Sequence, residues 1–153
     1  MSTQTDIRQA YSIMEASKLS GLPESTLRYY ETIGIINPIQ RDSSSKHRIY
    51  SDNDLNLIIG IACLSATGMS LDDMRVYLEN ASRGENAAAD QIGLLEAQSQ
   101  RLANEERYLK LRQKYLRTKA EYWKAISSKN ASLASELADK ASGIAKELKR
   151  EKT

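Results

Sequence analysis

The sequence is poor in the residues that build disulfides, thiolate metal cages and rigid turns. Its 153 residues include one cysteine, one histidine, two prolines and no phenylalanine. A single cysteine excludes an internal disulfide and a metal cage of several thiolates. No apolar run approaches the roughly 20 residues that span a bilayer, and no signal peptide is recognised. We therefore expect a cytoplasmic protein that holds no metal and no other cofactor.

Charge is unevenly distributed along the chain. Residues 1–80 hold seven Lys and Arg against ten Asp and Glu, a net charge of −3, whereas residues 81–153 hold fifteen against ten, a net charge of +5. The N-terminal half is not basic in bulk, which argues against nucleic acid as a partner. Its cations are clustered, however, and only charges near phosphates release counterions. The clustered residues are Arg28, Arg41, Lys46 and Arg48.

The segment from Ser12 to Glu31 has the pattern of two short helices joined by a tight turn. Ile13 and Ala16 share one helical face, Gly21 permits the turn, and Leu27 begins the inner face of the second helix. The outer face of that helix carries a guanidinium, a phenol and two hydroxyls, which can bond phosphate oxygens and base edges in a major groove. A solvated amphipathic helix is the alternative interpretation. The outer residues are Ser25, Arg28, Tyr29 and Thr32.

The next segment, residues 34–51, predicts a small β-hairpin wing. Two β-prone runs flank a polar tip at residues 42–46, and Pro38 suits an edge position. An irregular loop is the alternative. A wing would place its polar side chains on the DNA backbone beside the groove, and a phosphate contact is also the expected role of His47. The residues expected to clamp phosphates are Arg41, Lys46, Arg48 and Tyr50.

Two further helices are expected at residues 52–67 and 71–81, as a second pair packed on the first. Ser51 can cap the first of them, and acidic residues follow in its first turn. Apolar residues then repeat at helical spacing up to Gly68, and Ser70 begins the next helix.

Residues 11–81 resemble the MerR family of bacterial transcription regulators. The resemblance is carried by YSIMEASKLSGLPESTLRYYETIGIINP, by RIYSDNDL and by the helix that ends in ATGMSLDDM. It implies a mostly helical fold, in which a winged helix-turn-helix domain precedes a long dimerising helix. It also implies an operator inside an overlong promoter spacer, which the bound dimer distorts so that RNA polymerase can engage. The sequence departs from the family pattern at Pro23 and at the serine-rich wing tip, residues 43–45.

From residue 87 to 127 the apolar pattern changes to a heptad repeat, which is typical of a coiled coil. We expect two copies of this helix to cover the stripe in a homodimer, with folding back onto the chain's own domain as the alternative. The expected organisation is a flexible arm at residues 1–10, a winged helix-turn-helix domain at 11–82, a dimerisation helix at 83–127 and a short helical or disordered tail at 128–153. The stripe consists of Leu95, Leu102, Leu109, Leu116 and Trp123.

Cys63 is the candidate sensor. A cysteine at this point resembles the branch of the family that responds to aldehydes, other electrophiles and nitrosative stress, and the resemblance implies that Cys63 is the modified residue. The residues themselves favour an inert, buried thiol, because Ile59, Cys63 and Ala66 share one helical face and no Lys or Arg lies one turn away. The paired thiolates of metal-sensing members are missing.

No constellation in the sequence indicates catalysis. We find no nucleophile–base pair, no phosphate-cradling glycine loop and no carboxylate dyad, so an enzyme is not expected. The sequence favours a homodimeric regulator that reads an inverted-repeat operator in double-stranded DNA. Two alternatives stay open: a coiled-coil adaptor that no longer reads DNA, and a regulator of this family without a thiol sensor.

Overall fold

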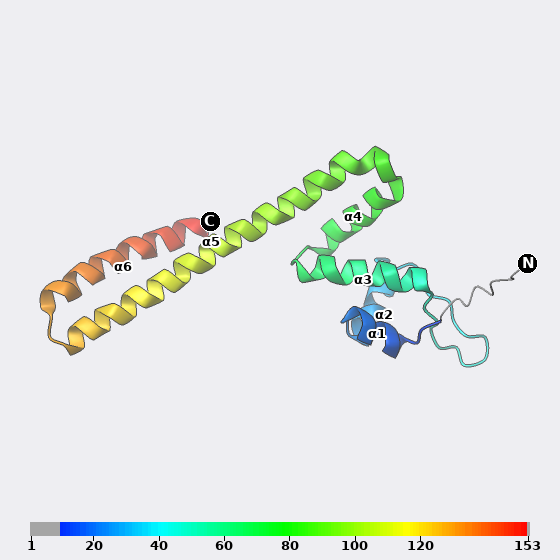
Figure 1. The fold of residues 1–153 in the computed structure, drawn as a ribbon, viewed down its shortest axis with the longest axis horizontal. Coiled ribbons are helices and arrows are strands. Elements are labelled where there is room, and N and C mark those ends of the chain that lie inside the picture. Colours follow the sequence, from blue (N-terminus) through cyan, green and yellow to red (C-terminus); the bar gives the residue numbers. More distant parts are fainter. Residues whose placement is uncertain (1–9, 153) are drawn as a thin grey trace, which may run out of the picture. The chain divides into compact units, whose positions relative to one another are not determined.

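The computed structural model describes residues 10–152, so the expected N-terminal arm lies almost entirely outside the described residues. The chain is mostly helical, as predicted (Figure 1). It forms two compact units whose border falls between Leu95 and Glu96. In chain order the elements are α1 (Ile13–Ser20), α2 (Glu24–Thr32), α3 (Asp52–Ala66), α4 (Leu71–Arg83), the 3-10 helix η1 (Gly84–Ala87), α5 (Ala88–Ser127) and α6 (Ala131–Glu151).

The predicted helix-turn-helix is present as α1 and α2. Ser12 and Glu15 form a capping box at the start of α1, in which each side chain accepts the other residue's backbone N–H at 3.2 Å. Gly21 ends α1 with a φ of 78°, in the left-handed region that a residue without a Cβ adopts at little cost. The Ser17 hydroxyl then donates to the Leu22 carbonyl over 2.7 Å and holds the turn.

The core of the first unit is built from the inner faces of the four short helices and of the connection between α2 and α3. Helix α1 contacts both α2 and α3, and α3 contacts α4. Burial of this apolar surface supplies most of the stability of helices that are too short to persist alone. The largest side chains that are fully buried are Tyr50, Leu27, Ile36, Ile58, Ile61 and Met74.

The expected β-hairpin wing is a closed loop rather than a two-stranded ladder. Within residues 10–152 the β-pairing consists of isolated bridges, Arg41 with Arg48 and Tyr11 with Tyr50. The loop is closed by backbone bonds from Asp42 N to the His47 carbonyl at 2.8 Å and from Ile49 N to the Gln40 carbonyl at 2.8 Å. Pairing stops there because the tip turns on itself, with Lys46 N bonding back to the Asp42 carbonyl at 2.9 Å.

The second pair of helices, α3 and α4, begins and ends within a few residues of the predicted bounds. Ser51 and Asp54 form another capping box, and the Ser70 side chain accepts from Asp73 N at 3.1 Å. From α4 the Arg75 guanidinium donates to the carbonyl of Ile33, the residue that follows α2. Helix α4 thus satisfies an acceptor that the end of α2 would otherwise leave unpaired.

In the second unit α6 runs back along α5 (Figure 1). The tail is therefore a helix of 21 residues, neither short nor disordered, and its amphipathic pattern is satisfied against α5. Ala125, Ala134 and Leu137 form the buried cluster nearest the connection, with Tyr122 packed against it. The end of α5 is thus used in part for packing within one chain.

No helix among residues 10–152 is long and apolar enough to cross a membrane.

Candidate nucleic-acid interface

Helix α2 presents its predicted outer face to solvent. Leu27 and Tyr30 are buried, 1% and 7% exposed, so the side chains between and beside them point outward. Pro23 precedes the helix and makes no side-chain capping bond, so Glu24 alone offers an anion to the first turn. The exposed residues are the predicted set, Ser25, Arg28, Tyr29 and Thr32.

The groups on this face are held loosely enough to take an external partner. Arg28 lies 3.6 Å from Glu24, one turn earlier, and about half of each side chain is exposed. The Thr32 hydroxyl donates to the Arg28 carbonyl over 3.0 Å, which leaves its oxygen free to accept. Tyr29 is 51% exposed and contacts the buried ring of Tyr30 at a centroid distance of 6.2 Å.

Asp42 organises the wing tip. Its Oδ1 accepts from Ser44 N at 3.0 Å, from Ser44 Oγ at 2.7 Å and from Ser45 N at 2.7 Å. These bonds, first among them that from the Ser45 backbone, hold the pKa of the Asp42 carboxyl well below its usual range. The turn lets Lys46 adopt a φ of 64° and lets Arg41 Nη1 donate to the Lys46 carbonyl over 3.1 Å.

Arg48 ties the wing to helix α2. Its Nε donates to Glu31 Oε1 over 2.8 Å, and the two side chains are only 18% and 16% exposed. Arg48 was predicted to clamp a flanking phosphate, but its guanidinium is already mostly buried against the Glu31 carboxylate. It therefore fixes the position of the wing and offers only its remaining N–H groups to a phosphate.

Basic side chains from α2 and the wing meet the start of α1 around one cavity of about 320 Å³. The N-terminus of a helix carries partial positive charge, and α1 begins at Ile13, so three sources of positive potential converge there. Such a site suits a phosphate of a nucleic-acid backbone. The lining residues are Ser12, Ile13, Met14, Arg28, Arg41, His47 and Arg48.

Tyr50 does not belong to this site. Its side chain is fully buried in the core, so the predicted contact with phosphate is wrong. Its backbone pairs with Tyr11 in both directions, at 2.9 and 2.8 Å, and so joins the end of the wing to the start of α1. Its hydroxyl has no hydrogen-bond partner in the part of the chain that the structure describes, and burial is the main cause that raises the pKa of Tyr50.

Two features of the site were not predicted from the sequence. The first is the start of α1, which the Ser12–Glu15 spacing of a capping box could have indicated. The second is Glu31, whose pairing with Arg48 joins residues that are 17 positions apart in the chain. No local sequence pattern predicts a contact between residues so far apart in the chain.

Cys63 is exposed on α3, so the expectation of a buried thiol is wrong. The face that it shares with Ile59 and Ala66 turns away from the core, and Ile59 is 38% exposed. The core side of α3 is formed instead by Leu55, Ile58 and Ile61.

The heptad stripe of α5 is also exposed in the single chain. Its five members are between 41% and 67% exposed. Leu109 and Leu116 each lie two positions from a less exposed residue, the half-buried Leu111 and the buried Thr118. A step of two residues is about 200° around a helix. Helix α6 thus covers one side of α5 and leaves the stripe uncovered on the other.

Comparison with known proteins shows that residues 11–81 match the MerR HTH family of regulatory proteins. The chain is 31% identical over 105 residues to an uncharacterized HTH-type transcriptional regulator of Haemophilus influenzae, covering 66% of this chain and 77% of that protein. It is 36% identical over 70 residues to the uncharacterized HTH-type transcriptional regulator YyaN of Bacillus subtilis, covering 46% of this chain but only 50% of the relative.

Among solved structures the chain is similar to HiNmlR, a MerR family regulator lacking the sensor domain, in a crystal structure bound to promoter DNA. The TM-score is 0.59 at 28% identity, and the match covers 84% of this chain and 96% of that one. The similarity therefore extends beyond the helix-turn-helix into the long helix.

Proposed function

The chain belongs to the MerR family of helix-turn-helix transcriptional regulators, and we propose that it binds an inverted-repeat promoter operator as a homodimer. The observation that carries the proposal is the cavity where α2, the wing and the start of α1 meet. Arg28, Arg41 and His47 reach it from two different segments, and a helix N-terminus closes it. A phosphate seated there would fix α2 against the adjacent major groove.

The exposed face of α2 would supply sequence readout. Arg28 is the side chain best suited to guanine, because a guanidinium can donate two parallel hydrogen bonds to its major-groove edge. Tyr29 and the hydroxyls of Ser25 and Thr32 would add contacts to the backbone or to base edges. Arg41 and Lys46 at the exposed wing would bind flanking phosphates, whose contribution is independent of sequence.

The homodimer is supported by the uncovered apolar stripe of α5. Leu116 and Trp123 are 67% and 62% exposed, and a row of such side chains along one helix face is rarely left in water. A second copy of α5 offers the matching heptad stripe. Two α2 helices would then face two half-sites related by the dimer axis, so the operator should be an inverted repeat.

The bound dimer is proposed to act by distorting the promoter so that RNA polymerase engages it. HiNmlR, which resembles this chain through both the helix-turn-helix and the long helix, has been crystallised on promoter DNA. Distortion is the property that the family resemblance implies. For Cys63 we propose alkylation or nitrosation as the input, supported by the exposure of the thiol and by the same resemblance.

Footprinting of the purified protein on its own upstream region, with and without a small aldehyde, tests these proposals together. We expect protection of an inverted repeat and a distortion at its centre that changes with aldehyde. Cys63→Ser should remove the response to aldehyde but keep the protection, and Ser65→Ala, on the same helix, should keep both. Protection that is unchanged by the aldehyde and by the Cys63 substitution would refute the thiol sensor and would leave the DNA-binding proposal intact.

A coiled-coil adaptor without DNA readout is the rival function, supported by the net charge of −3 over residues 1–80. It predicts an intact dimer with no salt-dependent affinity for random duplex. A regulator that binds DNA through α2 and the wing should instead lose duplex affinity steeply as the salt concentration rises, because each phosphate contact releases counterions. A flat salt dependence on random duplex would therefore overturn the DNA-binding proposal.

A further inference from the structure

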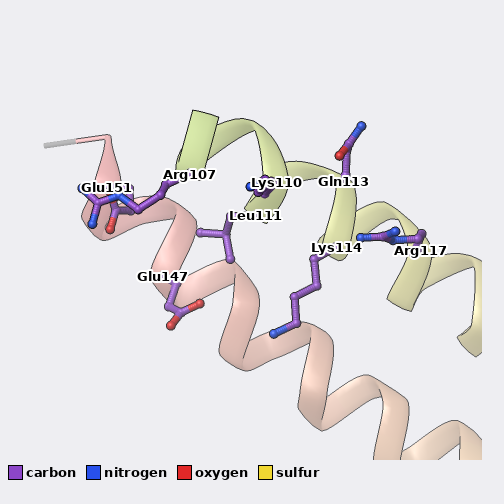
Figure 2. A pocket seen from close by; sticks show the side chains of 8 residues that line it. All are labelled: Arg107, Lys110, Leu111, Gln113, Lys114, Arg117, Glu147 and Glu151. Atoms are coloured by element: carbon purple, nitrogen blue, oxygen red, sulfur yellow. The ribbon is translucent and has the colours of Figure 1, made fainter. Parts of the chain in front are cut away.

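The second unit contains an open groove between α5 and the C-terminal end of α6. Its volume is about 620 Å³, within the range of small-molecule sites in proteins. The groove is lined by six side chains of α5 and by two glutamates of α6. Figure 2 shows Leu111 and Lys114 pointing toward α6, whereas Gln113 points away from it. Leu111, which is half-buried, lies between the two helices and supplies an apolar floor.

The α5 wall is a strip of four cations. Arg107, Lys110, Lys114 and Arg117 follow each other at intervals of three, four and three residues, which places them on one face over about 15 Å of helix. No acidic residue occurs between positions 107 and 120. A strip of this length matches a ligand with several negative groups in a row.

The two cations at the C-terminal end of the strip have no side-chain partner among the described residues, whereas the two at its N-terminal end are paired. Arg107 donates to Asn104 Oδ1 over 2.6 Å, and Lys110 lies 2.8 Å from Glu106. The side chains of Lys114 and Arg117, by contrast, make no hydrogen bond and no ion pair within residues 10–152. Two adjacent cations are thus free to receive an anion.

The α6 wall carries carboxylates that do not close the groove. Glu147 lies 4.0 Å from Arg150 on its own helix, and no ion pair crosses from Glu147 or Glu151 to α5 among the described residues. A purely structural clamp between the helices would join these opposite charges directly. The groove instead keeps acceptor groups on one wall and cations on the other.

We propose that this groove binds a nucleoside polyphosphate. The phosphates would lie along Lys110, Lys114 and Arg117, where charge-assisted hydrogen bonds are strongest. The sugar hydroxyls would donate to the carboxylates of Glu147 and Glu151, a pairing that proteins use to recognise ribose. The site lies wholly within the second unit, so binding does not depend on the proposed reading of DNA.

A bare polyphosphate does not match both walls. It would satisfy the cation strip but would place further negative charge opposite Glu147 and Glu151, which repel it. A nucleoside triphosphate turns its uncharged, donor-rich end toward those carboxylates. The chemistry of the two walls therefore favours the nucleotide over the inorganic ion.

Titration calorimetry of the full chain without DNA, with ATP and with inorganic tripolyphosphate, tests the proposal. We expect saturable binding of ATP at about 0.15 M salt, and weaker binding of tripolyphosphate. Lys114→Ala with Arg117→Ala should weaken ATP binding about tenfold or more. Each variant is first shown to keep its helix content and its elution volume.

The matched control removes the same charge from another face of α5. Arg112 and Lys119 lie two positions from Lys114 and Arg117, about 200° around the helix, where they stack on Tyr108 at 5.7 Å and on Tyr122 at 5.0 Å. Arg112→Ala with Lys119→Ala should leave ATP affinity within about twofold. Equal losses in the two double variants would show diffuse attraction of a polyanion and would overturn the site.

The glutamates supply the second arm of the test. Glu147→Gln with Glu151→Gln should weaken ATP, whose hydroxyls lose a charged acceptor, and should strengthen tripolyphosphate, which loses a repulsive wall. Tripolyphosphate that binds the parent chain as tightly as ATP would overturn the assignment of a nucleoside. Absence of saturable ATP binding would overturn the proposal as a whole.

Discussion

Arg48 in the wing donates to Glu31 in helix α2 over 2.8 Å, and both side chains are largely withdrawn from water. Among residues 10–152 the wing has no strand ladder to fix it, and the isolated Arg41–Arg48 bridge is the β-pairing between its two arms. The Glu31–Arg48 pair therefore supplies a direct link between the loop that is proposed to bind phosphates and the helix that is proposed to enter the groove. Several consequences of this arrangement and of the proposed dimer can be measured.

Glu31→Gln should destabilise the first unit and weaken DNA binding. The substitution leaves the half-buried guanidinium of Arg48 without its charged partner, at a cost of about 1–3 kcal/mol in the free energy of unfolding. Urea denaturation measures that cost. Glu24→Gln is the matched control on the same helix, because its pair with Arg28 is exposed and spans 3.6 Å, and it should change stability by only about 0.3 kcal/mol. Equal effects of the two substitutions would contradict a structural role of Glu31.

Arg41→Gln should reduce the salt dependence of duplex binding. One lost phosphate contact lowers the slope of log K against log salt by about 0.9, for operator and random duplex alike. Arg41 is the cleaner probe because it is exposed, whereas Arg48 also has its bond to Glu31. Lys140→Gln removes the same charge from the exposed surface of α6 and should leave the slope unchanged. An unaltered slope in the Arg41 variant would remove this residue from the interface.

Tyr50→Phe should leave DNA binding unchanged and should not lower stability at neutral pH. The ring keeps its place in the core, and only a hydroxyl without a partner among the described residues is removed. Burial raises the pKa of Tyr50, so the folded state holds its proton more tightly than the unfolded state does. The resulting stabilisation of the folded state is fully present below the usual tyrosine pKa of about 10, and it is lost as the pH rises through the higher pKa of Tyr50 in the folded state. Urea denaturation above pH 10 should therefore show less alkaline destabilisation in the variant.

The wing tip should stay closed in mild acid. The hydrogen bonds that Asp42 accepts from Ser44 and Ser45 lower its pKa, so they favour the closed turn above the usual carboxyl pKa of about 4 and are lost only as the pH falls through the lower, folded-state value. Backbone amide shifts of Ser44 and Ser45 follow the turn directly. Asp42→Ala should abolish any titration of these amides. A transition centred near pH 4 in the parent chain would show that the carboxylate is not held by the turn.

The parts of the fold that the sequence predicts well are those determined by local spacing. Ala16 and Leu27 are buried because helical periodicity turns them inward, and Gly21 adopts a positive φ because the turn requires it. The same logic places Arg28 and Tyr29 on the outer face of α2. Periodicity also predicts the long helix, since a seven-residue repeat persists over most of α5.

The misjudged residues depend on contacts between distant segments. Tyr50 carries a hydroxyl that could bind a phosphate, yet its backbone pairing with Tyr11 directs the ring into the core. Cys63 lies on a face of α3 whose sequence is apolar, but the face of α3 that packs into the core is the neighbouring one, with Ile58 and Ile61. Spacing along a helix identifies which residues share a face and does not say which face the rest of the fold covers.

Leu109→Glu combined with Leu116→Glu should convert the proposed dimer to monomers without unfolding the chain. Both leucines are exposed in the single chain, at 51% and 67%, so the new carboxylates meet water in the monomer and would be buried opposite each other only in a dimer. Sedimentation equilibrium measures the change in mass, and far-UV circular dichroism should show that helix content is kept. Glu121→Lys is the control, because this exposed residue lies away from the stripe, and it should leave the association state unchanged. Since inverted-repeat recognition requires two half-site readers, the monomeric variant should lose operator affinity far more than affinity for a single half-site. A variant that stays dimeric would place the subunit contact on another surface of the chain.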